Sequence, residues 1–289
     1  MVTFVGLVKT FQTTKNPFRV LYMAFKGGTC LVKFKNGLTC ELDLDQFMAL
    51  RDHYSWLKEG RLVATADGNW MIDLNNYRLL VSPKMLALSM FLITELKNGE
   101  YDADFSDKTV LDVGAFIGDT ACYFASKGAK KVVLYEPVLM HHEFIRKNID
   151  LNHVNAEVHK AGIDLVDGET IVPFDDDNAN LGGFGLHNKV GNKMISLKLK
   201  AVSNVIKESH ADIAKFDCEG AEECLVSVPV DVLRLISLFM IEIHSDALRD
   251  VIVNKFQECG FTIRKEYHNP TGHLYTIHFL RNDLCLFSS

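Results

Sequence analysis

The sequence predicts an α/β protein in which a mainly parallel sheet follows a smaller, hairpin-rich α+β region. From Thr109 onward, strand-like segments alternate with helix-like segments, which is the pattern of a mainly parallel sheet. Before about Gly99, short strands with alternating apolar and polar residues are joined by tight turns. At 289 residues the chain is long enough for one large and one small domain. We therefore expect an accessory region at residues 1–99 and a ligand-binding domain at residues 100–289.

A β-hairpin and two helices are the clearest elements of the N-terminal region. Residues 29–44 alternate apolar and polar side chains on both sides of Asn36-Gly37, a dipeptide that favours a two-residue hairpin turn. Residues 45–60 carry apolar side chains at helical spacing and end at a glycine. A second helix is expected at about Lys84–Lys97. Further strands are expected between these helices, at residues 60–74 and 77–81.

The second region is predicted to build the sheet, and its chain ends in two strands that flank Asn269-Pro270-Thr271-Gly272, which should form an antiparallel hairpin. A polar, glycine-rich stretch from Asp164 to Lys193 interrupts the alternation. It could close over an acceptor, with Asn180 or His187 contacting polar groups, or it could be a surface excursion. The expected strands are residues 109–114, 130–137, 156–163, 195–202, 213–220, 235–244, 261–268 and 274–281.

Charge and cysteine content argue against several functional classes. The chain carries 31 Lys and Arg against 37 Asp and Glu, a net charge of −6. Proteins bind nucleic-acid backbones through basic faces that release counterions, so this charge argues against a nucleic-acid partner. The seven cysteines include no C-x-x-C pair, which argues against a zinc ribbon and a disulfide framework. No apolar stretch approaches the roughly 20 residues that cross a bilayer and we find no export signal, so we expect a cytoplasmic protein without a membrane partner.

Residues 110–137 have the features of half a nucleotide-binding unit: a strand, a glycine turn, a helix and a second strand that ends in an acid. Gly114 permits the turn, and Glu136 lies where an acid accepts hydrogen bonds from ribose hydroxyls. Phe116, however, replaces the glycine that a pyrophosphate needs, and the carboxylate of Asp112 would repel phosphates. A nucleoside with a cationic tail and no phosphate fits better, so we expect S-adenosylmethionine, with Asp112 near its ammonium group. The expected cofactor contacts are Asp112, Gly114, Ala115, Phe116, Gly118, Asp119, Thr120, Glu136, Pro137, Gly162 and Asp217.

At this point the chain resembles the FkbM-type methyltransferases, which are class I S-adenosylmethionine enzymes. The resemblance rests on DVGAFIGDT at residues 112–120, on YEP with the later asparagines Asn148 and Asn152, and on FDCEGAEE at residues 216–223. It covers roughly residues 109–244, and the acidic D-x-E-G-A-E pattern is its most particular part. The resemblance implies a Rossmann-like, seven-stranded sheet whose last strand is antiparallel. It also implies methyl transfer to an acceptor that is often a sugar or natural-product hydroxyl.

Methyl transfer to an alcohol needs a group that removes the acceptor proton. Asp217 ends a predicted strand, Glu219 follows in the turn, and His244 ends the next strand, at the edge where open α/β sheets bind ligands. These three are our candidate catalytic residues, although His244 could equally face water or cap the next helix. Glu222 and Glu223 are expected to stabilise a helix start through its dipole. Asp217 and Glu219 could instead hold Mg²⁺, which prefers oxygen ligands, but we do not expect a metal.

The leading hypothesis is an S-adenosylmethionine-dependent O-methyltransferase that acts on a hydroxyl of a small or glycosylated acceptor. An RNA methyltransferase is the first alternative, and it would need a concentrated basic face. The second alternative is a non-catalytic protein that keeps the cofactor fold for assembly. We expect the region before Gly99 to lie beside the carboxyl ends of the strands and to help form the acceptor pocket. It could also supply a homodimer contact.

Overall fold

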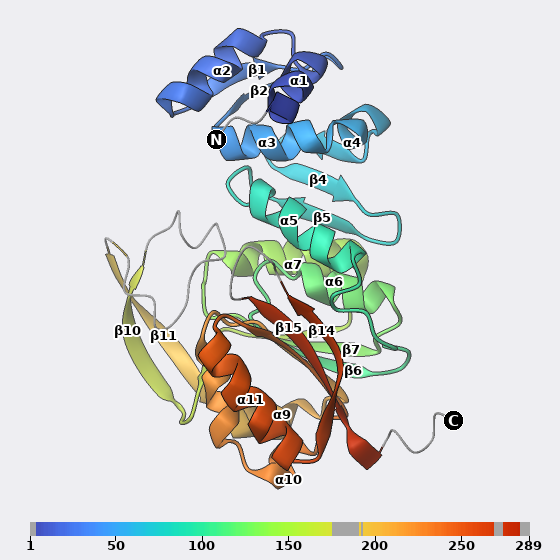
Figure 1. Cartoon of the computed structure of the whole chain (residues 1–289), viewed down its shortest axis with the longest axis vertical. Helices are drawn as coiled ribbons and strands as arrows, with labels where there is room; N and C mark the ends of the chain where they lie inside the picture. The colour runs from blue at the N-terminus through green and yellow to red at the C-terminus, as the bar shows by residue number, and fades with distance from the viewer. Residues whose placement is uncertain (1–3, 175–190, 192, 269–273, 284–289) are drawn as a thin grey trace. The chain divides into compact units, whose positions relative to one another are not determined.

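The computed structural model describes residues 4–174, 191, 193–268 and 274–283 (Figure 1). By its internal contacts the chain divides into two units, Met1–Thr94 and Glu95–Ser289. The predicted acceptor contacts Asn180 and His187, and the predicted turn Asn269 to Gly272, lie outside the described residues. In the described part of the chain, no helix is both long enough and apolar enough to cross a bilayer.

The first unit contains short helices and two small antiparallel sheets. The hairpin predicted around Asn36-Gly37 is confirmed, because Val32 pairs with Cys40 in an antiparallel ladder. Buried aromatic side chains such as Phe34 and Phe47 stack in its core. The elements are α1 (Phe4–Thr13), α2 (Pro17–Lys26), β1 (Cys30–Lys33), β2 (Thr39–Leu42), α3 (Leu44–Asp52), α4 (Tyr54–Glu59), β3 (Leu62–Ala64), β4 (Trp70–Asp73), β5 (Arg78–Val81) and α5 (Leu86–Lys97), which crosses into the second unit.

The helices of the first unit differ from the prediction in two respects. No helix was predicted before residue 45, yet the described chain begins with α1 and α2. Pro17 in the first turn of α2 is a helix-start signal, because the missing N–H would have no helical partner there. The helix predicted over residues 45–60 is interrupted at His53, which ends α3 and precedes α4. Its predicted glycine stop is present, since Gly60 ends α4 with a φ of 72°.

A seven-stranded sheet forms the second unit, in the order β14-β15-β13-β12-β6-β7-β8. Six of its strands point in the same direction, whereas the last strand, β15, is antiparallel to both of its neighbours. The predicted class I methyltransferase sheet with an antiparallel last strand is therefore confirmed. The strands are β6 (Thr109–Val113), β7 (Lys131–Tyr135), β8 (Ala156–His159), β12 (Ile213–Phe216), β13 (Leu238–Ile243), β14 (Phe261–His268) and β15 (Tyr275–Arg281).

A three-stranded sheet in the middle of this unit departs from the prediction. The predicted strand at residues 156–163 divides into β8 and β9, which belong to different sheets. The polar stretch expected from Asp164 to Lys193 contains a strand, β10, which pairs antiparallel with β11. The residues of β10 pair with β11, more than 18 residues further along the chain. Because strand formation depends on such pairing, the local sequence predicted β10 only weakly. The strands are β9 (Gly162–Asp164), β10 (Gly168–Phe174) and β11 (Lys193–Ala201).

The connecting helices leave the carboxyl ends of β6 and β12 next to each other at the centre of the sheet. From β6 the chain proceeds to β7 and β8 on one side and later to β12 and β13 on the other, so a topological switch point lies between β6 and β12. Open α/β sheets bind their ligands at such a point. The helices are α6 (Asp119–Ser126), α7 (His141–Asn152), α9 (Val202–Ser209), the 3₁₀ helix η1 (Ala221–Ser227), α10 (Val230–Leu233) and α11 (Asp246–Glu258).

Gly114, directly after β6, should be intolerant of any side chain. Its φ is +81°, and a Cβ atom there would lie 1.7 Å from the carbonyl oxygen of Asp217. We expect Gly114→Ala to lower the free energy of unfolding by more than about 3 kcal/mol, because it adds a backbone clash to an unfavourable φ. Gly128→Ala is the control, since Gly128 has a φ of +100° but its Cβ would lie 3.5 Å from the nearest atom. Denaturant unfolding should show a cost of only about 1–2 kcal/mol there, and equal costs would contradict the close approach.

Candidate functional site

The turn between β6 and α6 brings the predicted glycines to the switch point. Gly114 lies against the backbone of Asp217, and Gly118 precedes α6 with a φ of 79°. A Cβ at Gly118 would make only an ordinary contact of 3.6 Å with Ile145, so the backbone conformation is the reason for this glycine. Phe116, between them, also has a positive φ, 45°. The turn therefore has three residues in a backbone region that most side chains disfavour.

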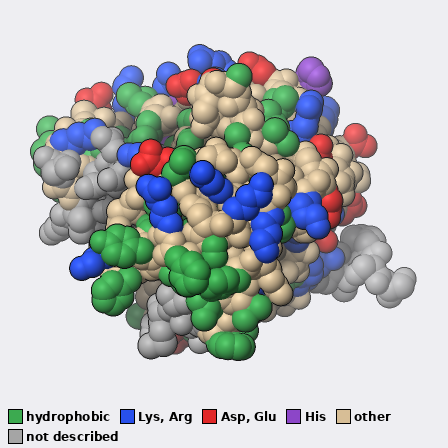
Figure 2. Space-filling view, turned by 90° about the horizontal axis from the view of Figure 1, so that it is seen from above, with side chains coloured by type: hydrophobic (Ala, Val, Ile, Leu, Met, Phe, Trp, Pro, Cys, Tyr) green, Lys and Arg blue, Asp and Glu red, His purple; other side chains and the backbone are tan. Residues whose placement is uncertain are grey.

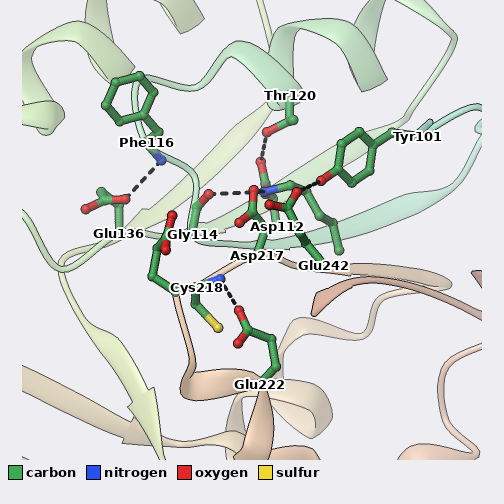
Figure 3. Close-up of polar contacts among 12 residues, drawn as sticks. Tyr101, Asp112, Gly114, Phe116, Thr120, Glu136, Asp217, Cys218, Glu222 and Glu242 are labelled. Carbon is green, nitrogen blue, oxygen red and sulfur yellow. Dashed lines mark hydrogen bonds and ion pairs between the residues drawn. The ribbon is translucent and has the colours of Figure 1, made fainter. Parts of the chain in front are cut away.

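Glu136, at the end of β7, fixes the shape of this turn. One carboxylate oxygen, Oε2, accepts a hydrogen bond from the backbone N–H of Phe116 at 2.9 Å (Figure 3). The other, Oε1, accepts from the N–H of Val138 at 2.8 Å and lies 3.2 Å from Nδ1 of His141. Glu136 thus has a structural task besides the ribose contact predicted for it.

A buried lysine joins the ends of β6 and β12. Nζ of Lys215 lies 3.3 Å from Oδ1 of Asp112 and 3.2 Å from Oδ2 of Asp217, and it donates a hydrogen bond to the carbonyl oxygen of Gly114 at 3.1 Å. Oδ2 of Asp112 accepts a further bond from the hydroxyl of Thr120 at 2.6 Å. Figure 3 labels Asp112, Gly114, Thr120 and Asp217 near one another between the two strands. Burial lowers the pKa of Lys215, but the charges of Asp217 and Asp112 outweigh it and raise the pKa above its ordinary value.

Sequence reasoning missed Lys215, although one signal was present. The strand IAKF is apolar except for this lysine, and all four of its residues are buried in the sheet. A charged residue inside a strand that is buried on both faces must have a partner, because unpaired buried charge is costly. Asp112 is the residue opposite Lys215 in the parallel ladder between β12 and β6. The sequence alone could not show that pairing.

The D-x-E-G-A-E segment forms a tight turn held by Glu222. Its carboxylate accepts hydrogen bonds from the backbone N–H groups of Cys218 and Gly220, at 2.5 and 2.8 Å. The helix that follows is a 3₁₀ helix, and the side chain of Glu222 is buried. Glu222 therefore acts through specific backbone hydrogen bonds, a more definite role than the predicted dipole effect. The turn gives Glu219 a φ of 54°.

His244 lies among carboxylates at the end of β13. Its Nε2 atom is 3.5 Å from a carboxylate oxygen of Glu219 and 3.5 Å from one of Glu242, and Nδ1 is 4.0 Å from Glu222. Burial lowers the pKa of His244, but the bond to Glu242 and the charges of Glu219, Glu222 and Asp217 outweigh it and raise the pKa to about 9. At neutral pH the imidazole is therefore protonated. In this state it holds the neighbouring carboxylates and cannot accept a proton.

Asp217 and Glu242 share this crowded environment. Burial and the charge of Glu242 raise the pKa of Asp217, while the ammonium of Lys215 opposes the shift. Glu242 accepts a hydrogen bond from the hydroxyl of the buried Tyr101 at 2.8 Å. Nearby, burial and the charge of Glu242 raise the pKa of Glu95 to about 9. Because carboxylates outnumber cations here, the site favours binding of a cationic ligand over an anionic one.

The remaining predicted contacts lie around the same turn. Pro137 and Gly162 are neighbours, since a Cβ at Gly162 would lie 3.6 Å from the Pro137 ring. Ala115 is buried in the turn, and Thr120 and Asp119 open α6. Burial raises the pKa of Asp119 to about 6.

Three of these groups also have the geometry to hold a metal ion. One ligand atom from each of Asp217, Glu242 and His244 lies within 4.8 Å of the others. Glu219, which we named as a potential Mg²⁺ ligand, is not part of this group. Lys215 and the protonated His244 already supply positive charge to it.

Comparisons with solved structures find proteins of the methyltransferase class. The chain is 16% identical to ribosomal protein L11 methylase from Lactobacillus delbrueckii subsp. bulgaricus, covering 69% of this chain and 80% of that one at a TM-score of 0.38. The chain is 10% identical to precorrin-6y C5,15-methyltransferase from Geobacter metallireducens GS-15. The match covers 66% of this chain and 88% of that one, at a TM-score of 0.40. The chain is 13% identical to the tRNA m1G37 methyltransferase of M. jannaschii, at a TM-score of 0.41. The match covers 74% of this chain but only 57% of that one, so this chain spans little more than half of that protein.

No protein-family model and no curated protein matches the chain. The three structures have TM-scores below 0.5, so the fold assignment depends on the strand order and direction in this chain.

The raised pKa of His244 should appear as a pH-dependent stability. A folded-state pKa of about 9 against an ordinary 6.5 means that the native state holds the proton more tightly. The stabilisation is complete below about pH 6.5 and disappears as the pH rises through about 9. We expect His244→Gln to lower the free energy of unfolding by up to about 3 kcal/mol below about pH 6.5, and by little above about pH 9. Denaturant unfolding of both proteins across this range measures it, and a pH-independent difference would contradict a protonated His244.

Proposed function

We propose that this protein is an S-adenosylmethionine-dependent methyltransferase that methylates a hydroxyl group on a small or glycosylated acceptor. One observation carries the proposal: a cluster rich in carboxylates lies beside a glycine turn at the switch point of a class I methyltransferase sheet. Such a site favours a ligand with positive charges and no phosphate. The FkbM-type resemblance of residues 112–120 and 216–223 supports the same reaction class.

The residues present fit this cofactor. Oδ1 of Asp112 is buried and accepts no hydrogen bond from the described residues, although Lys215 lies near it. An ammonium group or a bound water could supply that missing donor. Glu136 offers a carboxylate at the end of β7, where ribose hydroxyls bind in folds of this type. Phe116 occupies the position where a dinucleotide needs a glycine.

When bound, S-adenosylmethionine supplies an electrophilic methyl group. The chain then has to hold the acceptor hydroxyl in line and receive its proton. Asp217 and Glu219 are the proton acceptors that we propose, because burial raises the pKa of both carboxyls toward the range where a general base works well. His244, the third predicted catalytic residue, would instead orient Glu219 and Glu242 through its charge.

RNA methylation remains the alternative substrate class. Several proteins of similar fold are described as RNA methyltransferases, including the tRNA enzyme from M. jannaschii. The net charge of −6 favours a small acceptor over a phosphate backbone. Incubation with methyl-labelled cofactor and separate panels of glycosides, phenolic alcohols and RNA, followed by mass analysis, distinguishes the two. Label in RNA alone would overturn the hydroxyl-acceptor proposal.

The cofactor assignment predicts selective ligand binding. Calorimetry should show binding of S-adenosylmethionine and S-adenosylhomocysteine but not of NAD. Glu136→Gln should weaken binding by about 1–3 kcal/mol, because it loses charged acceptors for the ribose. Since Glu136 also bonds to Phe116 and Val138, the variant needs a thermal unfolding control. Unchanged affinity in a folded variant would remove Glu136 from the ribose site, and affinity for NAD would refute the cofactor class.

Catalysis should depend on Asp217 and Glu219 more than cofactor binding does. We expect Asp217→Asn and Glu219→Gln to lower turnover about 10²–10⁴-fold with an acceptor identified by the panels, and to weaken cofactor binding by a much smaller factor. Glu223→Gln is the matched control, because Glu223 lies in the same segment outside the cluster around His244. EDTA should leave the rate unchanged. Variants that keep turnover within a few-fold would mean that the acidic turn is structural, and inhibition by EDTA would point to Asp217, Glu242 and His244 as metal ligands.

A further inference from the structure

The first two helices of the chain expose large apolar side chains to an unusual degree. Phe25 is 83% exposed, Phe4 79% and Phe18 75%. Contiguous exposed apolar surface of this kind commonly marks an interaction site. Figure 2 views the molecule from above and shows apolar side chains gathered on this face, with Lys and Arg side chains beside them. The other exposed apolar residues of these helices are Val5, Val8, Phe11 and Tyr22.

These residues form a continuous face across α1 and α2. In each helix the exposed apolar residues recur at i, i+4 and i+7, which places them on one side. The rings of Phe11 and Phe18 meet edge to face at a centroid distance of 5.4 Å, which joins the two stripes. The aromatic face, as we name it, consists of Phe4, Val8, Phe11, Phe18, Tyr22 and Phe25.

α1 has the reverse of the usual amphipathic arrangement. Its buried residues are Gly6, Thr10 and Thr13, while its phenylalanines face outward. The hydroxyls of Thr10 and Thr13 donate to the helix's own carbonyl oxygens at Gly6 and Lys9. A helix that only covered its own unit would bury its large apolar residues, because that burial drives packing. The outward phenylalanines are therefore available for another surface.

The segment of the chain that carries the aromatic face has basic residues and no acidic ones. Residues 1–40 contain no Asp or Glu, although the whole chain has a net charge of −6. Lys9 pairs with Asp52 of α3, whereas Lys15, Arg19 and Lys26 make no ion pair with a described carboxylate. The basic residues of this segment, all exposed, are Lys9, Lys15, Arg19, Lys26, Lys33 and Lys35.

We propose that the aromatic face docks onto an anionic phospholipid surface, with its phenylalanines in the interface and the basic residues on the headgroups. Charge complementarity selects this occupant: a symmetric dimer through this face would bring the same cations together. At ten residues each, α1 and α2 are about 15 Å long, half the hydrocarbon thickness, so they would lie flat on the membrane. The sequence argued against a membrane partner because nothing could span a bilayer, and surface docking requires no span.

Co-sedimentation of the full chain with vesicles tests the proposal. The wild-type protein should sediment with vesicles of equal parts phosphatidylcholine and phosphatidylserine, less so at high salt, and should not sediment with phosphatidylcholine alone. Phe18→Ser combined with Phe25→Ser should weaken binding at least about tenfold, because two exposed rings lose their burial in lipid. Arg19→Glu combined with Lys26→Glu should weaken it to a similar degree. All four positions are exposed, so the fold should tolerate the changes.

Two matched variants control for composition. Phe91→Ser removes a half-exposed ring of α5, and Lys207→Glu reverses an exposed charge of α9. Both should bind vesicles like the wild type. The proposal is overturned if the wild type does not sediment with the mixed vesicles, or if the aromatic double variant binds as well as the controls. It is also overturned if the face instead retains a single-stranded oligoribonucleotide in gel shifts, or mediates self-association in sedimentation velocity, without vesicle binding.

Discussion

The ammonium group of Lys215 is the interaction on which the site depends. It links the side chain of Asp112 and the carbonyl of Gly114, at the end of β6, to the side chain of Asp217, at the end of β12. Buried carboxylates without a cation would carry a large desolvation cost. Lys215 therefore lets this chain keep acidic groups buried at the switch point between β6 and β12. The close approach of Gly114 to the Asp217 backbone belongs to the same junction.

The charge balance around that junction explains the direction of the pKa shifts. Asp112, Asp217, Glu219 and Glu242 outnumber the cations Lys215 and His244. The pKa of His244 rises and its proton stays, while the carboxyls of Asp217 and Glu219 become harder to ionise. A cationic ligand would reverse the shifts of the carboxyls, because it favours their charged form. Binding of a cationic ligand at this site would therefore be coupled to proton release.

Much of the fold could be predicted because its signals are local. The hairpin at Asn36-Gly37 and the strand–helix alternation after Thr109 both come from short-range patterns. β10 could not be predicted, since its pairing with β11 joins segments distant in sequence. The helices α1 and α2 were missed although their apolar residues recur at helical spacing and Pro17 marks the start of α2.

The candidate site shows the same division. Gly114, Glu136 and Asp217 were predicted as site residues from their positions at strand ends. The partners of Lys215 and His244 depend on which strands are neighbours in the sheet. The sequence of a single segment does not show that neighbourhood.

The backbone of Phe116 has a consequence for how the turn after β6 would meet a ligand. Glycine adopts a positive φ without strain, whereas the positive φ of Phe116 is stabilised by two contacts. Its N–H donates a hydrogen bond to Glu136, and its ring packs edge-on against His141 with the ring centroids 4.7 Å apart. A turn fixed by side-chain contacts has fewer conformations to lose than one built from glycines alone. The turn is therefore preorganised, and a ligand that fits against it would lose little binding energy to ordering the loop. The same rigidity would penalise a bulkier ligand that required the loop to move.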